Sequence, residues 1–355
     1  MLENLLLPLK EKAHHGHMNV RFLSYLLESL PIIAVRRLLQ SKNPNLIQAP
    51  SNFPEIAKRH TQMLIEEDKR MIRRGLYSYP EFSFTQPKKH LVSYVRLLKD
   101  SVNAAMRARK NKNSEFSSDI AKDIETYPEY YRRNFHYQTD GYLSKESADL
   151  YEHQTEILFR GSLALMRRVL LAPVCETLKY NKTKKLKVLE IACGTGEAID
   201  FLSSNYSNFE LYAIDLSEAY LEKAKEKVKN NLEVNFQKMA AEDLKFSNDE
   251  FDIVYCCFLH HELPQEIRKK SFEEAYRVLK PGGKFVMVDS VQKGDQPDFD
   301  WALHNFPIEF HEPFYKNYTQ KPVIELHQGL NITNLQEEVQ LLSKSFSYIK
   351  GEENS

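Results

Sequence analysis

Residues 188–198 read VLEIACGTGEA, and this stretch decides the fold. It begins with apolar residues that favour a buried strand and continues into Gly194 and Gly196, which are separated by one residue. A strand that leads through glycines into a helix presents backbone N–H groups and a helix N-terminus to a ligand. The stretch therefore predicts a ligand-binding loop between a strand and a helix.

Further short β-rich runs follow along the chain and alternate with helical stretches. The runs are KLKVLEIA (185–192), FELYAID (209–215), LEVNFQ (232–237), FDIVYCCF (251–258) and KFVMVD (284–289). Such alternation is typical of βαβ units, which build a parallel sheet covered by helices on both faces. Residues 334–352 have the pattern of a closing hairpin.

Residues 1–112 have only helical periodicity, and the polar stretch RKNKNSEFSSD (109–119) predicts a boundary. We therefore expect an N-terminal helical domain (1–112) and a second domain (113–355). Within the latter, residues 113–184 form an aromatic and helical lid, and residues 185–355 form a Rossmann-like core. One long helix is expected from Ser144, which caps it, as far as APV (172–174).

Three classes of ligand compete for the glycine loop. A nucleoside-triphosphate loop needs a lysine after its last glycine, whereas Glu197 follows Gly196. A dinucleotide loop needs a third small residue where Ile199 stands, and Glu190 and Glu197 would repel a pyrophosphate. S-adenosylmethionine carries a sulfonium and an ammonium and no phosphate. Its positive charges would be attracted by these two acidic residues.

In motif order, VLEIACGTGEA, LYAIDLS, AAEDLKFSNDEFDIVYC and VLKPGGKFVMVDS span about residues 185–290. This ordered set resembles the class I S-adenosylmethionine-dependent methyltransferases, and within them the group similar to the ubiquinone/menaquinone C-methyltransferases. The resemblance implies an α/β fold with a seven-stranded, mostly parallel sheet. It also implies that the cofactor lies at the carboxyl ends of the first strands.

The resemblance also assigns roles to residues. Glu190 would balance the methionine ammonium, Gly194 and Gly196 would line the methionine moiety, and Asp215 would bind the ribose hydroxyls. The remaining cofactor-binding candidates are Ala192, Leu216, Ala241, Glu242 and Asp243. The chain departs from the family at Ala192, where the family has a glycine, and at Ala240, where it often has an adenine-binding Asp or Asn.

The loop after the fourth strand, CFLHHELP (257–264), carries the catalytic candidates His260 and His261. An imidazole titrates near neutral pH and can take a proton from an acceptor, and Glu262 could orient it. Adjacent side chains on an extended segment point in opposite directions, so we expect at most one histidine to face the site. Cys256 and Cys257 lie in an apolar strand and are interpreted as packing residues.

Two aromatic segments are candidates for the acceptor pocket, because aromatic rings with a few polar groups suit a partly apolar substrate. The segment at 134–143 contributes Tyr137 and Tyr142, together with His136 and Asp140. The segment at 305–318 contributes His311 and Tyr315, together with Glu312 and Tyr318. We predict no metal site, because the histidines of HHGH (14–17) have no acidic partner in sequence and are interpreted as solvated.

Composition narrows the class of protein. No stretch is long and apolar enough to span a membrane, the N-terminus lacks signal-peptide features, and the four cysteines have no zinc or disulfide spacing. A cytoplasmic protein is therefore expected.

The charges are distributed unevenly along the chain. Residues 1–112 hold 20 Lys and Arg against 9 Asp and Glu, and the rest holds 29 against 40. We interpret this asymmetry mainly as attraction between the two parts.

The sequence therefore predicts a methyltransferase for a small or lipid-like organic acceptor, and a homodimer is possible. Nucleic acid is a less favoured partner. Two alternatives stay open: an RNA or protein methyltransferase that docks through the basic N-terminal region, and a cofactor-binding module without catalysis. Salt-sensitive binding to RNA would favour the first alternative.

Overall fold

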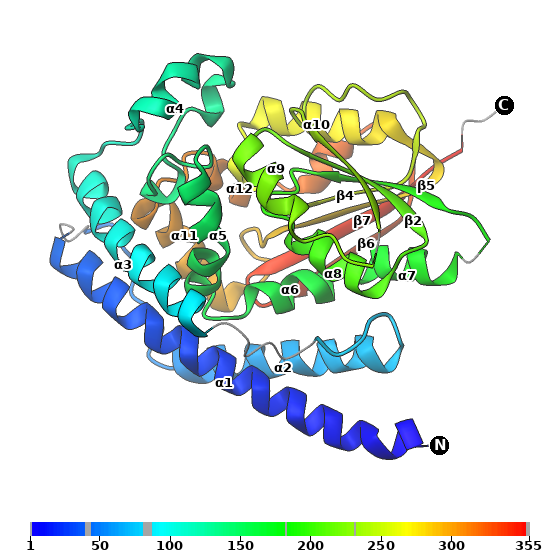
Figure 1. The fold of residues 1–355 in the computed structure, drawn as a ribbon, viewed down its shortest axis with the longest axis horizontal. Helices are drawn as coiled ribbons and strands as arrows, with labels where there is room; N and C mark the ends of the chain where they lie inside the picture. The colour runs from blue at the N-terminus through cyan, green and yellow to red at the C-terminus, as the bar shows by residue number, and fades with distance from the viewer. Residues whose placement is uncertain (1, 40–43, 81–86, 182, 231, 353–355) are drawn as a thin grey trace.

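The computed structural model describes residues 2–39, 44–80, 87–181, 183–230 and 232–352 (Figure 1). Its centre is a seven-stranded sheet in the order β3-β2-β1-β4-β5-β7-β6. The strands are β1 (Leu186–Ile191), β2 (Phe209–Asp215), β3 (Glu233–Lys238), β4 (Phe251–Cys257), β5 (Leu279–Ser290), β6 (Ile332–Gln340) and β7 (Ser343–Lys350). The predicted seven-stranded sheet is confirmed.

The first five strands pair in parallel, while β7 runs antiparallel to β5 and β6 antiparallel to β7. The predicted closing hairpin is therefore present as β6 and β7. Strand β1 lies in the middle of the sheet, between β2 and β4. Because all three are parallel, the loops that follow them emerge at the same edge, and the glycine loop opens there.

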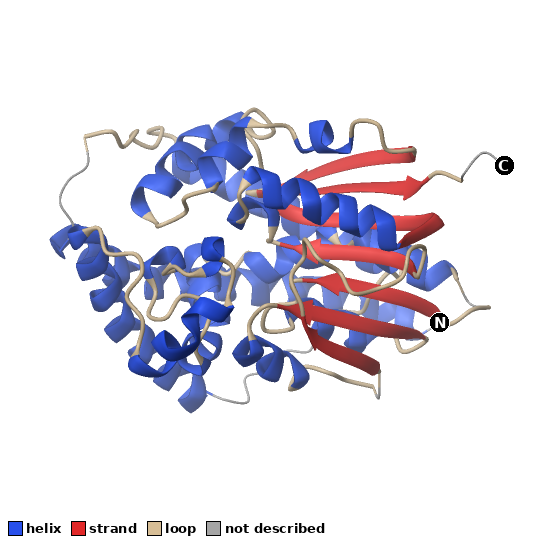
Figure 2. Cartoon of the chain, turned by 90° about the horizontal axis from the view of Figure 1, so that it is seen from above, coloured by secondary structure: helices blue, strands red, loops and turns tan. Residues whose placement is uncertain are grey.

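Helices cover both faces of the sheet and extend beyond its edge. They are α1 (Leu2–Leu39), α2 (Phe53–Arg73), α3 (Pro87–Lys110), α4 (Ser118–Asp123), α5 (Lys145–Leu158), α6 (Leu163–Leu170), α7 (Ala172–Tyr180), α8 (Glu197–Asn205), α9 (Glu218–Lys225), α10 (Gln265–Val278), α11 (Asp300–Glu309) and α12 (Tyr315–Gln320). Figures 1 and 2 show the sheet at one side of the molecule and α3, α4, α5 and α11 gathered beyond the end of its strands.

Each face of the sheet has its own hydrophobic core. Alternate residues of a strand point to opposite faces, so Val188 packs with α7, α8 and α9, whereas its neighbour Leu189 packs with α10. All side chains of β1 except that of Lys187 are buried, as expected for a central parallel strand. This double core fixes the sheet edge that carries the loops.

The single helix expected from Ser144 is wrong, because the chain forms three helices there. Ser144 does cap α5, since its hydroxyl accepts a hydrogen bond from the N–H of Ser147 at 3.1 Å. The helix then ends at Leu158, and Gly161 continues with a φ of +83°. Pro173 starts a new helix, α7, because proline has no N–H for an intrahelical bond.

The N-terminal helices pack directly on the rest of the chain. Helix α2 lies against α6, and α1 and α3 lie against α5. Asp68 of α2 is fully buried and binds Arg168 of α6 through two contacts of 2.6 Å. His14 also contacts Asp68, at 2.7 Å, so the expectation that the HHGH histidines are solvated is wrong for this one. In the described part of the chain, no helix combines the length and apolarity that a membrane span requires.

Candidate active site

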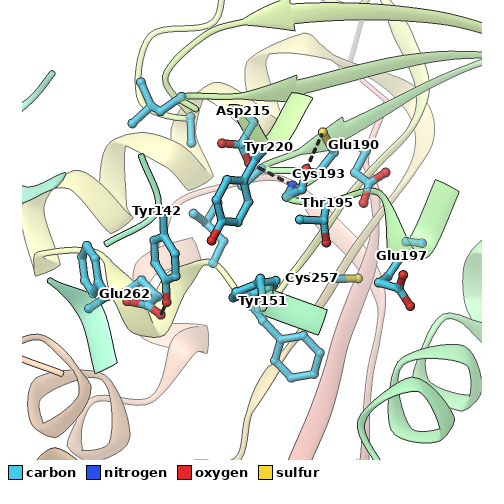
Figure 3. Close-up of a pocket in the computed structure, with 18 of the residues that line it drawn as sticks. Tyr142, Tyr151, Glu190, Cys193, Thr195, Glu197, Asp215, Tyr220, Cys257 and Glu262 are labelled. Carbon is cyan, nitrogen blue, oxygen red and sulfur yellow. Dashed lines mark hydrogen bonds between the residues drawn. The ribbon is translucent and has the colours of Figure 1, made fainter. Parts of the chain in front are cut away.

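A pocket opens where β1, β2 and β4 end, between the sheet and the helices beyond it. It holds about 980 Å³ of space between atoms, and this figure includes space that is open to solvent. Figure 3 shows Glu190, Glu197 and Asp215 toward one end and Tyr142 with Glu262 toward the other. We call these the cofactor end and the acceptor end, respectively, in keeping with the predicted roles of their residues.

The glycine loop forms the wall of the cofactor end. Gly196 has a φ of +84°, and a Cβ atom there would lie 2.8 Å from the Cα of Ala224, so helix α9 approaches too closely for a side chain. Gly194 has a φ of +56°, with open space where a side chain would stand. Ala192 also has a φ of +56°, which explains why glycine suits this position in the family.

Asp215 stands at the end of β2 and reaches back to the glycine loop. Its two carboxylate oxygens accept hydrogen bonds from the N–H of Gly194 at 2.9 Å and the N–H of Ser217 at 2.8 Å. Burial raises the pKa of Asp215 to about 6, although these backbone hydrogen bonds oppose the shift. The carboxylate is thus held in place at the pocket wall.

Glu190, at the end of β1, is a buried carboxyl group on the same wall. Its Oε2 accepts a hydrogen bond of 2.8 Å from the hydroxyl of Tyr255 in β4. Burial raises the pKa of Glu190 to about 8, although the hydrogen bond from Tyr255 and the charge of Arg167 oppose the shift. A cationic ligand would supply a positive charge to pair with it.

The other candidates at the cofactor end differ in position. Leu216 and Ala241 line the pocket, while Glu242 accepts a hydrogen bond from Tyr130 at 2.8 Å. Asp243 is exposed and pairs with Lys245. Thr195, which sequence reasoning missed, lines the pocket with a buried hydroxyl that has no hydrogen-bond partner in the described structure.

The two candidate catalytic histidines face different surroundings. His260 stacks on Phe272 with ring centroids 4.0 Å apart, and burial lowers its pKa to about 3. His261 has its Nδ1 2.5 Å from Oδ1 of Asp289, and its Nε2 lies 3.6 Å from Oε1 of Glu262. Burial lowers the pKa of His261, but the Asp289 carboxylate outweighs burial and the net shift is upward.

This arrangement assigns the two nitrogens of His261 different tasks. If Nδ1 donates its proton to Asp289, Nε2 carries a lone pair on the side of Glu262. Glu262 lines the pocket, and its Oε1 accepts a hydrogen bond of 2.7 Å from Tyr142. Neither histidine is among the residues that line the pocket. His261 is connected to the acceptor end only through Glu262, and the ring of His260 packs into the core.

The acceptor candidates are only partly brought together. Tyr142 lines the pocket. The ring of Tyr137 lies against that of His311, at 5.5 Å, and Tyr315 bonds Ser290 at 2.7 Å; these three are not among the lining residues. Most of the pocket's aromatic wall was not singled out from the sequence and consists of Tyr130, Tyr131, Phe135, Tyr151, Tyr220 and Phe258.

Cys257 also lines the pocket, although its neighbour Cys256 is buried in the core. Burial raises the pKa of the Cys257 thiol far above its ordinary value. The thiolate is the nucleophilic form of cysteine, and this environment disfavours it. The geometry therefore agrees with a packing role for both cysteines.

Comparisons with known proteins agree with this geometry. Residues 188–283 match a family described as a methyltransferase domain. The chain is 30% identical over 134 residues to the ubiquinone/menaquinone biosynthesis C-methyltransferase of Geotalea daltonii, covering 35% of this chain and 56% of that protein. It is 32% identical over 141 residues to the demethylmenaquinone methyltransferase of Leptospira interrogans, covering 39% and 55%. It thus spans about half the length of these relatives.

Among solved structures, the CurJ carbon methyltransferase has a similar fold. The two align over 98% of this chain and 96% of that one, with a TM-score of 0.50 and 11% sequence identity. The similarity of fold therefore includes the N-terminal helices. Residues 188–283 constitute a class I S-adenosylmethionine-dependent methyltransferase domain, as the sequence predicted.

Proposed function

We propose that this chain is an S-adenosylmethionine-dependent methyltransferase that acts on a small or lipid-like organic acceptor. The observation that carries the proposal is the pair of buried carboxyl groups, Glu190 and Asp215, beside the glycine loop of a segment that matches a methyltransferase domain. The relatives include quinone-pathway C-methyltransferases, which favours an acceptor with an apolar body.

The cofactor end fits S-adenosylmethionine in charge and in hydrogen-bonding capacity. Glu190 offers a buried carboxyl group that forms no ion pair with a side chain of the described structure, and the methionine ammonium would pair with it. Asp215 would hold the ribose, and the unpartnered hydroxyl of Thr195 would hydrogen-bond the methionine moiety. When bound, S-adenosylmethionine supplies an electrophilic methyl group on a sulfonium.

The acceptor end would position the second substrate and exclude water from it. Tyr131, Phe135, Tyr142 and Tyr151 give it an aromatic wall. Holding the nucleophilic atom in line with the methyl group supplies much of the rate enhancement in such a displacement. An acceptor with an acidic O–H or C–H must also lose a proton.

We assign the removal of that proton to His261. Asp289 fixes the ring at Nδ1, so Nε2 is the nitrogen that would receive the proton, and Glu262 lies between it and the pocket. This is the arrangement of a general base that a carboxylate orients. His260 has a packing role in this proposal, because its ring lies against Phe272.

An RNA or protein acceptor is less favoured, because many basic groups of the N-terminal region are already paired. Arg21 binds Glu156 at 2.9 Å, and Arg96 binds Glu146 at 2.7 Å. Arg59 binds Asp298 at 2.5 Å. These contacts support attraction between the two parts of the chain as the cause of the charge asymmetry.

Calorimetry with S-adenosylhomocysteine and with NADH tests the cofactor assignment. We expect the first compound to bind and to raise the unfolding temperature, because it binds only the folded state, and the second to do neither. Tight NADH binding without S-adenosylhomocysteine binding would refute the proposal. A panel of phenols, quinols and β-dicarbonyl compounds with methyl-labelled S-adenosylmethionine then searches for the acceptor.

A further inference from the structure

Three titratable side chains meet beside the acceptor end of the pocket, and of the three only Glu262 is among the residues that line the pocket. They are His136, Glu262 and Glu312, and one potential ligand atom of each lies within 4.8 Å of the others. They come from three separate stretches, at 134–143, 257–264 and 305–318, which the sequence singled out as candidate catalytic or pocket segments. The fold therefore gathers one nitrogen and two carboxylate ligands from distant parts of the chain.

The cluster is buried, and its carboxyl groups are poorly satisfied. The side chain of Glu312 is fully buried, and that of Glu262 is 12% exposed. Among the described residues, no hydrogen bond of ordinary geometry reaches either oxygen of Glu312 or Oε2 of Glu262, although Nδ1 of His136 lies 3.3 Å from Oε1 of Glu312 and the two carboxyl groups are close enough to share a proton. A buried carboxylate without partners is costly, so these oxygens call for a proton or a cation.

The described residues form no ion pair from a lysine or arginine to the cluster, although the charge of Arg36, which packs on Phe310, acts on His136. Nδ1 of His136 lies 3.3 Å from Oε1 of Glu312, and the rings of Phe306 and Phe310 pack around this histidine at about 6 Å. His261 is the nearest other basic group to Glu262, and it is already bound to Asp289. Two adjacent carboxyl groups in such an apolar setting match the charge of a divalent ion.

A second cluster, with one glutamate and two histidines, differs from the first in its internal contacts. Glu28, His90 and His153 also lie within ligand distance of one another. In that cluster each carboxylate oxygen of Glu28 contacts one histidine Nε2 at 2.7 Å. Hydrogen bonds within the cluster account for its geometry, and it needs no ion.

We propose that His136, Glu262 and Glu312 bind a divalent first-row transition-metal ion beside the acceptor end of the pocket, which Glu262 reaches. Imidazole and carboxylate ligands together suit Mn²⁺, Fe²⁺ or Zn²⁺. Ligands about 2.1 Å from a metal ion lie roughly 3 to 3.5 Å apart, so a small inward movement completes the site. The proposal departs from the absence of metal predicted from the sequence, in which the three ligands are too far apart to be recognised.

The ion would give Glu262 a defined role. Three protein ligands leave coordination positions open, and Glu262 lies on the pocket wall, so an open position can face the acceptor. If the proposed function holds, the acceptor is a compound that offers an oxygen to the metal, such as a phenol or an enolisable carbonyl compound. The metal would orient that oxygen and lower the pKa of the acceptor.

Titration of Mn²⁺ into the chelator-treated full-length chain, followed by electron paramagnetic resonance, tests the site. We expect one bound ion per chain, which Zn²⁺ displaces, and coupling of the bound Mn²⁺ to one imidazole nitrogen. Glu312→Gln and His136→Gln should weaken Mn²⁺ binding by at least about tenfold. Glu28→Gln is the matched control and should bind as the unsubstituted protein does.

Absence of stoichiometric Mn²⁺ binding, or equal affinity in Glu312→Gln, would overturn the proposal and leave a proton shared by the two carboxyl groups. Circular dichroism checks that the variants fold. If Glu312→Gln does not fold, the nitrogen coupling in the unsubstituted chain decides, and its absence counts against the site. S-adenosylhomocysteine binding should be unchanged in Glu312→Gln. S-adenosylhomocysteine binding therefore tests the proposed function, and Mn²⁺ binding tests the metal site, so the failure of one can be told from the failure of the other.

Discussion

The cofactor end and the acceptor end of the pocket are built in different ways. The cofactor end is formed mainly by residues at the carboxyl ends of β1 and β2, and backbone N–H groups hold Asp215 there. The acceptor end is assembled from three segments that lie far apart in the chain, and no hydrogen bond of ordinary geometry reaches the carboxyl oxygens of Glu312 in the described structure. The first depends on local chain geometry, and the second on long-range packing.

Because the two ends are built differently, substitutions at each end should affect different properties of the protein. Changes at the cofactor end should alter stability or cofactor affinity, because the glycine loop is part of the fold. Changes at the acceptor end should alter turnover while cofactor affinity remains. The predictions below follow this division, from the largest expected effect to the smallest.

His261→Ala should lower kcat by about 10²–10⁴, because it removes the proposed general base. The affinity for S-adenosylhomocysteine should stay close to that of the unsubstituted chain. Steady-state kinetics with the best acceptor from the panel, together with calorimetry, measure both quantities. His304→Ala, at a distant histidine that contacts Asn45, is the control. Turnover near the unsubstituted level in His261→Ala would show that His261 is not the general base.

Gly196→Ala should destabilise the protein by about 2–5 kcal/mol, because it adds a left-handed alanine and a clash with Ala224. Gly194→Ala should cost only about 1–2 kcal/mol, since the space beside it is open. Urea unfolding without ligand gives both values. Equal losses would show that the close approach of α9 does not constrain the loop.

Asp215→Ala should weaken S-adenosylhomocysteine binding by about 1.5–3 kcal/mol, the usual value of hydrogen bonds to a charged group. Asp243→Ala serves as the comparison, because Asp243 is exposed and paired with Lys245. It should change the affinity little, although the sequence made it a cofactor candidate. Isothermal titration calorimetry of the two variants decides between them, and a larger loss in Asp243→Ala would contradict the geometry.

Binding of S-adenosylhomocysteine at pH 7 should release close to one proton. The pKa of Glu190 is raised to about 8, so this group is mostly protonated in the free protein, and a bound ammonium favours its ionised form. Affinity should therefore rise with pH, by less than tenfold per unit, up to about pH 8, above which Glu190 is already ionised in the free protein.

Calorimetry in buffers of different ionisation enthalpy counts the protons released. Glu190→Gln removes the titrating group, so it should abolish the proton release. Release of the same size in this variant would place the titrating group elsewhere in the site.

The sequence predicted the sheet and the cofactor end well because both depend on local patterns. Strand periodicity located the first five strands, and the glycines with Asp215 marked the edge where the ligand loop lies. Residues 144–174 were predicted poorly, since helical periodicity continues across the breaks near Gly161 and Pro173. These two residues were the available signals.

The acceptor end could be predicted only as a set of segments. Tyr142 reaches the pocket, whereas the rings of Tyr137 and His311 lie against each other, tilted by 43°, and neither residue lines the pocket. Which ring of an aromatic segment faces inward depends on backbone turns such as the positive φ of His136, +53°. No pattern in the residues themselves specifies that turn, so the meeting of His136 with Glu312 required the structure.

A crystal structure of the protein with S-adenosylhomocysteine tests the central claim most directly. The account predicts the ribose at Asp215, the ammonium at Glu190 and the sulfur facing the space beside Tyr142 and Glu262. A ligand bound outside this pocket, or one whose sulfur points away from Glu262, would contradict the assignment of the two ends.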